Sequence, residues 1–154
     1  MIAFFDTNIY IDYLKGIFPK KSYEGYFERY IVRICPVVYQ ELIRCIRSGR
    51  LHNRVEELTE KVLFLPPPTS RMWTRAGELA AKVAGSYDER SLERIQNDLL
   101  IALTARENGA TLITGDHAFR VIQRFVPFHL ILEEHQLTDT QVKRFWKRIH
   151  KPPK

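Results

Sequence analysis

Five short apolar runs occur along the chain, separated by longer segments with helical periodicity. They are IAFF at 2–5, YIVRICP at about 30–36, KVLFL at 61–65, ATLIT at 110–114 and FHLIL at 128–132. Short apolar runs that alternate with helices predict an α/β fold with a mainly parallel sheet. Because helices cover both faces of such a sheet, we expect a three-layer α/β/α domain.

Two of the helical segments have recognisable ends. Apolar residues, Trp73 among them, recur at helical spacing over 72–83, and Gly85 follows as a stop signal. A second helix is expected over about 92–107, where an Asn-Gly pair ends it.

The chain fits a single domain over residues 1–154, since no internal repeat or linker-like composition divides it. The three prolines at 66–68 form too short a run to separate two domains. The final stretch, LTDTQVKRFWKRIHKPPK, predicts a last helix from about Asp139 with a basic tail.

The charge balance favours a polyanionic partner. The sequence has 24 Lys and Arg against 18 Asp and Glu, which gives a net charge of +6 and a pI of about 9.4. No apolar run approaches the ~18 residues of a membrane span, and the first residues lack the pattern of a signal peptide. We expect a cytoplasmic protein with no membrane partner, in which Cys35 and Cys45 are reduced core thiols.

Two aspartates lie just after predicted strands. Asp6 comes after IAFF, and Asp116 comes after the strand in TLITGD. Ligands of parallel α/β sheets bind at the carboxyl ends of the strands, where both aspartates are expected. Either residue taken singly also fits a helix N-cap or a turn.

Two further acids fall on the packed sides of predicted helices. Asp98 in NDLLIALTA shares a helix face with Ala102 and Ala105, and that projection turns Asn97 away from the same face. Glu41 in PVVYQELIRC is flanked by apolar neighbours in the same way, and a salt bridge to Arg44 or Arg75 is the alternative explanation. A buried carboxylate needs hydrogen bonds or a cation to offset its desolvation.

Four carboxylates that converge on one pocket repel one another unless a divalent cation binds. Hard oxygen donors select Mg²⁺, with Mn²⁺ as a substitute, over zinc. Such an ion activates water and stabilises the charge that develops on a phosphodiester. Together with the basic composition, this predicts a nuclease.

The motifs FFDTNIYID, VVYQEL, NDLLIALTARENGATLIT and TGDHAF, in this order, closely resemble those of PIN-domain ribonucleases, especially the VapC toxins of toxin-antitoxin pairs. The resemblance covers nearly the whole chain. It implies a metal-dependent endoribonuclease that forms a homodimer and is silenced by a cognate antitoxin. It also implies a metal-binding acidic cluster, made of Asp6, Glu41, Asp98 and Asp116.

The same resemblance assigns supporting residues. Asn8 and Thr114 match polar positions that orient the carboxylates or water, whereas Thr7 is better explained as a cap residue. Ala118 stands where many VapC proteins carry another acid, which puts a second tightly held metal ion in doubt. His117 is interpreted as a surface turn residue, because a metal ion activates water without an imidazole base.

Basic residues follow the predicted Glu41 helix. Arg44, Arg47 and Arg50 are candidates for contact with an RNA backbone, although a run of charges also fits a solvated face. The homodimer finds additional support in the aromatic residues Tyr23, Tyr26 and Phe27, which we expect to exceed what one core requires.

Two other classes of protein compete with the nuclease hypothesis. A non-catalytic PIN-like module would bind RNA or protein and use its acids structurally. A phosphorylated receiver domain would need adjacent acids after its first strand and a lysine after its last, and neither FFDTN nor FHLIL supplies them. The sequence names neither the RNA that is cut nor the antitoxin.

Overall fold

The structure, a computed structural model, describes residues 1–46, 49–83 and 89–134. At its centre lies a four-stranded sheet in the order β2-β1-β3-β4, in which every pair of neighbouring strands is parallel. The strands are β1 (Ile2–Phe5), β2 (Ile31–Val32), β3 (Thr111–Thr114) and β4 (His129–Leu132). The predicted parallel α/β sheet is therefore confirmed.

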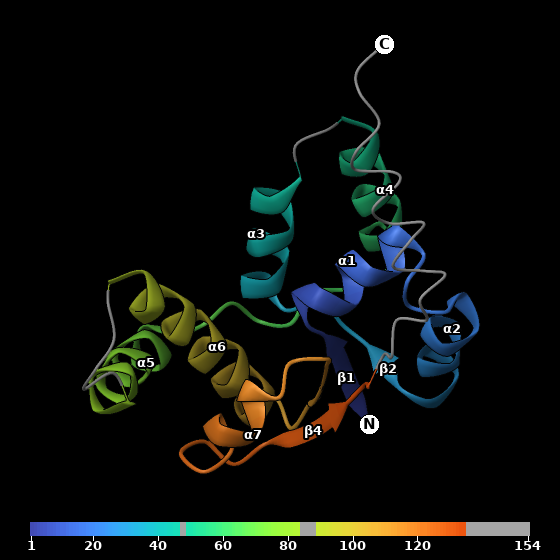
Figure 1. Ribbon diagram of the computed structural model, residues 1–154. Coiled ribbons are helices and arrows are strands. Elements are labelled where there is room, and N and C mark those ends of the chain that lie inside the picture. Colours follow the sequence, from blue (N-terminus) through green and yellow to red (C-terminus); the bar gives the residue numbers. More distant parts are fainter. Residues whose placement is uncertain (47–48, 84–88, 135–154) are drawn as a thin grey trace.

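Helices surround this sheet (Figure 1). Within the described residues they are α1 (Thr7–Lys15), α2 (Lys20–Arg29), α3 (Pro36–Cys45), α4 (Gly49–Thr59), α5 (Ser70–Val83), α6 (Glu89–Glu107) and α7 (Ala118–Ile122). In Figure 1, α2 lies beside β2, and α5 and α6 lie together on the other side of the molecule.

Both faces of the central strands are covered. Ala3, Phe4 and Phe5 of β1 are all inaccessible to solvent, although successive residues of a strand point to opposite faces. Leu112 and Ile113 of β3 are equally buried. A strand without a solvated face is typical of a parallel sheet between two helical layers, so the three-layer α/β/α architecture is confirmed.

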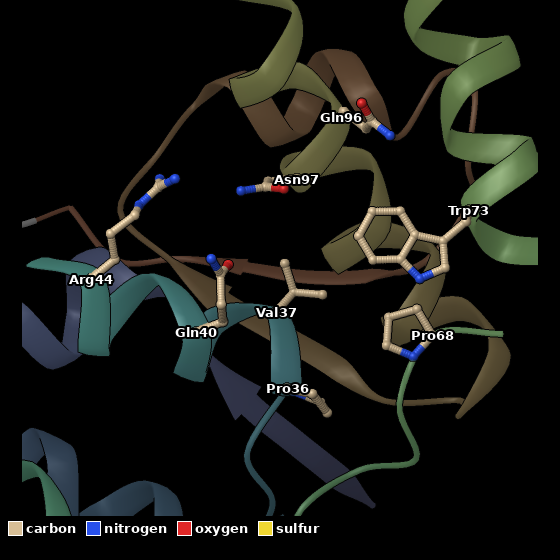
Figure 2. Close-up of a pocket in the computed structure, with 8 residues that line it drawn as sticks. All are labelled: Pro36, Val37, Gln40, Arg44, Pro68, Trp73, Gln96 and Asn97. Carbon is tan, nitrogen blue, oxygen red and sulfur yellow. The ribbon is translucent and has the colours of Figure 1, made fainter. Parts of the chain in front are cut away.

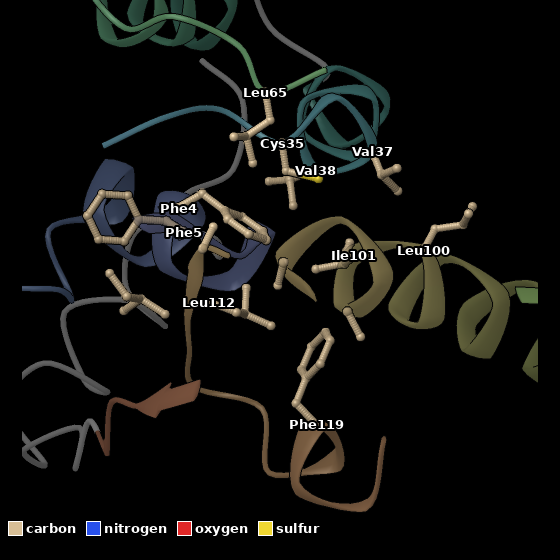
Figure 3. Packing of buried hydrophobic residues seen from close by; sticks show 14 of the residues in the cluster. Phe4, Phe5, Cys35, Val37, Val38, Leu65, Leu100, Ile101, Leu112 and Phe119 are labelled. Atoms are coloured by element: carbon tan, nitrogen blue, oxygen red, sulfur yellow. The ribbon is translucent and has the colours of Figure 1, made fainter. Parts of the chain in front are cut away.

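The core extends from the sheet into the helical layers (Figure 3). Val38 of α3 and Ile101 of α6 are fully buried near β1 and β3. Phe119 of α7 points toward α6, so that even this short helix is tied to the core by a large side chain. Burial of a side chain of this size contributes about 1.5–3 kcal/mol.

The run at 61–65 does not form the predicted strand. It contributes only one isolated parallel bridge, between Phe64 and Ile34, and the second run is shortened to β2. Leu63 is 67% exposed and Phe64 47% exposed, so the run has too few buried neighbours to extend the sheet. The prolines at 66–68 that follow lack backbone donors and cannot continue a ladder.

The helix predictions are confirmed within the described residues. Helix α5 covers the predicted span, and α6 begins at Glu89, three residues earlier than expected. Gly109 has a φ of +55°, the left-handed conformation that glycine adopts readily, where α6 ends and turns toward β3. Gly85 and the helix predicted from Asp139 lie outside the described residues.

The two cysteines have different environments. Both are free, but only Cys35 lies in the core, where burial raises its thiol pKa to about 11. Cys45 ends α3 and is exposed, so its predicted core position is wrong. In the described part of the chain, no helix is long and apolar enough to cross a membrane.

The aromatic residues that supported the homodimer mostly belong to the core. Tyr23 and Tyr26 are 5% and 3% exposed and pack against the Phe5 ring. The Tyr26 hydroxyl also donates a hydrogen bond to Glu133. Of the three residues, only Phe27 is substantially exposed, at 41%. The idea that they exceed the needs of one core is therefore wrong for both tyrosines, and the homodimer stays a prediction.

Candidate active site

Asp6 lies where β1 ends and α1 begins. Its backbone N–H continues the sheet by donating to the Ile113 carbonyl at 2.9 Å, and its Oδ1 accepts from the Thr7 N–H at 2.7 Å as the N-cap of α1. Asp6 is therefore both the residue at the end of β1 and the N-cap of α1. Only 6% of this residue is exposed, which separates it from an ordinary surface cap.

The second carboxylate oxygen of Asp6 connects the ends of β1 and β3. It accepts hydrogen bonds from the Asn8 amide and the Thr114 hydroxyl, both at 2.7 Å. The Asn8 amide nitrogen also donates to Thr114 Oγ1 at 3.0 Å, and the Asn8 oxygen accepts from the Gly115 N–H at 3.0 Å. Asn8 and Thr114, which the resemblance named as supporting residues, thus both contact the carboxylate of Asp6.

Glu41 is held in place by two neutral side chains. Its Oε2 accepts from the Thr7 hydroxyl at 2.6 Å, and its Oε1 accepts from the Asn97 amide at 2.9 Å. The ion pairs found among the described residues do not include Glu41, and Arg75 pairs instead with Glu78. These contacts join α3 to α1 and α6.

Two expectations are corrected at Glu41. Thr7 is more than a cap residue, because its hydroxyl reaches across to α3. Asn97 does not point away from the site, because its amide contacts Glu41. A helical projection shows which residues share a face of α6, but not that α3 packs on the side where Asn97 lies.

Asp98 and Asp116 are less buried than Asp6. Asp98 is half-buried on α6, directly after the residue that contacts Glu41. Asp116 is exposed; its Oδ1 accepts from the Ala118 N–H at 2.8 Å, and its own N–H donates to Thr114 Oγ1 at 3.0 Å. A single hydroxyl, that of Thr114, therefore bonds to Asp6 and to the backbone of Asp116.

Burial raises the pKa of Asp6 from 3.8 to about 6. Hydrogen bonds from Thr114 and Thr7 oppose this rise, whereas the negative charges of Glu41 and Asp116 add to it. Three of the four predicted carboxylates are therefore close enough to interact electrostatically. A cation placed among them would favour the ionised form of Asp6.

The donor chemistry of these residues fits a hard divalent ion, since carboxylate oxygens are the ligands that Mg²⁺ prefers. Among the described residues, however, no group of three or more His, Cys, Asp or Glu side chains is arranged as a metal cage. The oxygens of Asp6 and Glu41 are already engaged by protein donors. Asp6 Oδ1 and both oxygens of Glu41 accept only one of these hydrogen bonds each, so each keeps a second lone pair on which an ion could bind.

The predicted RNA-binding arginines are only partly described. Arg44 is exposed near the end of α3, Arg47 lies outside the described residues, and the side chain of Arg50 is likewise not described. His117 and Ala118 are both exposed at the start of α7. The surface position of His117 agrees with its interpretation as a turn residue.

A pocket of about 400 Å³ lies beside Glu41 (Figure 2). It is lined by Pro36, Val37, Gln40 and Arg44 of α3, Pro68, Trp73 of α5, and Gln96 and Asn97 of α6. Trp73 is 48% exposed, so its expected place on the apolar face of α5 is wrong. The sequence patterns did not indicate this pocket, although a large aromatic residue at the edge of an apolar stripe is a usable signal.

Comparison with known proteins agrees with this architecture. Residues 3–124 match the family model of the PIN domain. The fold is similar to a chain of a solved structure described as "Crystal structure of VapBC2 from Rickettsia felis bound to a DNA fragment from their promoter", with a TM-score of 0.63 and 18% identity. That match covers 87% of this chain and 100% of the other. No curated protein matches the sequence.

Proposed function

Because the chain belongs to the PIN domain family, we propose that it is a metal-dependent endoribonuclease that hydrolyses RNA phosphodiester bonds in the cytoplasm. We further propose that it is the toxin of a type II toxin-antitoxin pair and acts as a homodimer. The similarity to a VapBC2 structure supports this assignment through its fold, and the net charge of +6 supports a nucleic-acid substrate.

The hydrogen-bond network at the carboxyl edge of the sheet supports the proposal most directly. Asp6, Glu41 and Asp116 come from three separate segments, and each carboxylate is bound by neighbouring donors. Their charges act together on the pKa of Asp6. A buried carboxyl with a raised pKa at a strand end of a parallel sheet is typical of a functional site.

Asp6, Glu41, Asp98 and Asp116 would hold one Mg²⁺ or Mn²⁺ ion. When bound, the ion supplies charge stabilisation for the phosphate and activates water. Thr114 and Asn8 fix the orientation of Asp6, while Thr7 and Asn97 fix that of Glu41. Because these donors are neutral, they align the carboxylates without cancelling the negative charge that attracts the ion.

The decisive experiment is a cleavage assay on single-stranded RNA with Mg²⁺ and with EDTA. We expect cleavage by the wild type with Mg²⁺ only, and its loss in Glu41→Gln, which preserves shape but removes a charged ligand. Glu78→Gln is the matched control, since Glu78 is an exposed glutamate paired with Arg75 on α5. Activity that persists in EDTA or in Glu41→Gln contradicts the proposal.

The alternative is a non-catalytic PIN-like module that binds RNA or protein. The engagement of the Asp6 and Glu41 oxygens by protein donors is what this alternative predicts. RNA binding without cleavage, unchanged by Mg²⁺ and by Glu41→Gln, would identify it.

A further inference from the structure

The pocket beside Glu41 combines an exposed aromatic ring with amide side chains. Trp73 lies at one side of the pocket and Arg44 at the other, with Asn97 and Gln40 between them (Figure 2). At about 400 Å³, the pocket falls within the range of ~300–1,000 Å³ that is usual for small-ligand sites. We propose that this pocket binds one unpaired base of an RNA substrate, with Trp73 as its stacking platform.

The exposure of Trp73 favours this occupant. An indole that is 48% exposed presents much of its apolar surface to water. Proteins that bind single-stranded nucleic acids stack bases on such rings, because every base has an apolar face of similar size. The neighbouring Pro68 extends the apolar part of the wall.

The polar groups of the pocket match the edge and the backbone of a nucleotide. Gln40 and Gln96 carry amides, which offer both donors and acceptors to the edge of a base. Arg44 supplies a cation for a phosphate, and none of the described residues that line the pocket is acidic. A polyanion can therefore enter here without meeting the carboxylates first.

Asn97 connects the pocket to the acidic site. It lines the pocket, and its amide nitrogen donates to Glu41 at 2.9 Å. A base held against Trp73 would thus place its own phosphates near the carboxylates. This inference rests on the proposed RNA substrate and adds to it the residues that would select which base lies beside the cleaved bond.

Binding can be measured without cleavage. In EDTA, a 12-nucleotide single-stranded RNA of mixed sequence is titrated into a Trp146→Phe variant, so that the emission reports only Trp73. We expect quenching by the single strand and much weaker quenching by the same RNA annealed to its complement. No quenching by single-stranded RNA at up to about 1 mM would overturn the proposal and leave the pocket to a protein partner.

Substitutions at Trp73 separate base stacking from the general electrostatic attraction between the RNA and the protein. By fluorescence anisotropy of a labelled RNA, Trp73→Ala should bind the strand about 5- to 150-fold more weakly, the range for loss of one base stacked on an aromatic ring. Trp73→Phe should restore most of the affinity. The control is Phe125→Ala, which removes an aromatic residue of similar exposure (43%) outside the pocket.

Two outcomes distinguish this inference from the proposed function. If the wild type cleaves RNA with Mg²⁺ and Trp73→Ala binds and cleaves equally well at the same positions, the base pocket is refuted and the nuclease stands. If no RNA is cleaved but quenching and affinity still depend on Trp73, the pocket stands and the nuclease fails.

Discussion

An aspartate follows each of two neighbouring parallel strands, directly after β1 and one residue later after β3, yet the two side chains differ in environment. Asp6 is 6% exposed and its carboxylate accepts three hydrogen bonds, whereas Asp116 is exposed and its carboxylate accepts one from the turn that follows it. The difference arises because β1 runs directly into α1 under the cover of α3, while β3 opens into a turn. The burial and hydrogen bonding of an aspartate after a parallel strand therefore depend on which elements cover the strand end.

The largest expected effect is the loss of RNA cleavage in Asp98→Asn. The amide keeps the shape but removes one negative charge, so we expect activity to fall by at least ~100-fold, more than is usual for residues outside the ligand set. The metal-free variant should melt at the same temperature as the wild type or higher, because repulsion among the carboxylates is reduced. Cleavage assays and melting curves with and without millimolar Mg²⁺ check both parts.

A normal cleavage rate in Asp98→Asn would make Asp98 a structural acid. The same conclusion follows if Mg²⁺ does not stabilise the wild type and the variant melts much lower.

Replacement of Asp6 and of Asp116 by alanine should lower the free energy of unfolding by different amounts. Asp6→Ala leaves the buried Thr114 hydroxyl without its acceptor and removes one of the two acceptors of the Asn8 amide. Together with the lost cap of α1, this should cost about 2–4 kcal/mol. Asp116→Ala should cost less than about 1 kcal/mol, because its partner N–H remains accessible to water. Urea unfolding of both variants measures this difference. Equal losses of unfolding free energy would contradict the claim that Asp6 contributes more to stability than Asp116.

The carboxyl of Asp6 should make the stability of the protein depend on pH. The pKa of Asp6 rises from 3.8 to about 6 on folding, so the folded state holds the proton more tightly than the unfolded state. Its contribution to stability is complete below about pH 4 and is lost as the pH rises through about 6, a change of roughly 3 kcal/mol.

Urea unfolding in EDTA at a series of pH values tests this sign. The free energy of unfolding of the wild type, compared with that of Asp6→Asn, should fall between pH 4 and pH 7.5. A constant difference across that range would show that the carboxyl of Asp6 has the same affinity for its proton in both states.

A small effect on stability is expected at the contact between α6 and α3. Asn97→Ala removes one hydrogen bond to Glu41, which is only half-buried, and should cost about 0.5–1.5 kcal/mol. Gln96→Ala is the matched control on the same helix, since Gln96 lines the pocket beside Asn97. If both variants unfold at the same urea concentration, the Asn97 contact adds no stability to the fold.

Sequence patterns sufficed for β1, β3 and β4, because each is a compact apolar run that ends at a polar residue. They failed at residues 61–65, where an equally apolar run stays largely exposed. Whether such a run joins a sheet depends on a neighbouring strand, and local sequence does not contain that information.

The residues of the candidate site likewise divide into those that the sequence predicted and those that it did not. The positions of Asp6, Asn8 and Thr114 follow from the strand ends and from the resemblance to PIN domains, and the structure brings them into contact. Thr7 and Asn97 were missed because their partner, Glu41, lies on a helix distant in sequence. Helical periodicity identifies the face of a residue but not the element that packs against it.

The bond between Thr114 and Asp6 spans 108 residues, and β1 finds its β3 neighbour only across that distance. During synthesis, the first aspartate leaves the ribosome long before the strand that orients it. A nascent chain therefore has no assembled acidic site until β3 has emerged, which at about 5–20 residues per second is several seconds later. For a protein proposed to cut RNA, this order of assembly would delay the activity until most of the chain has been made.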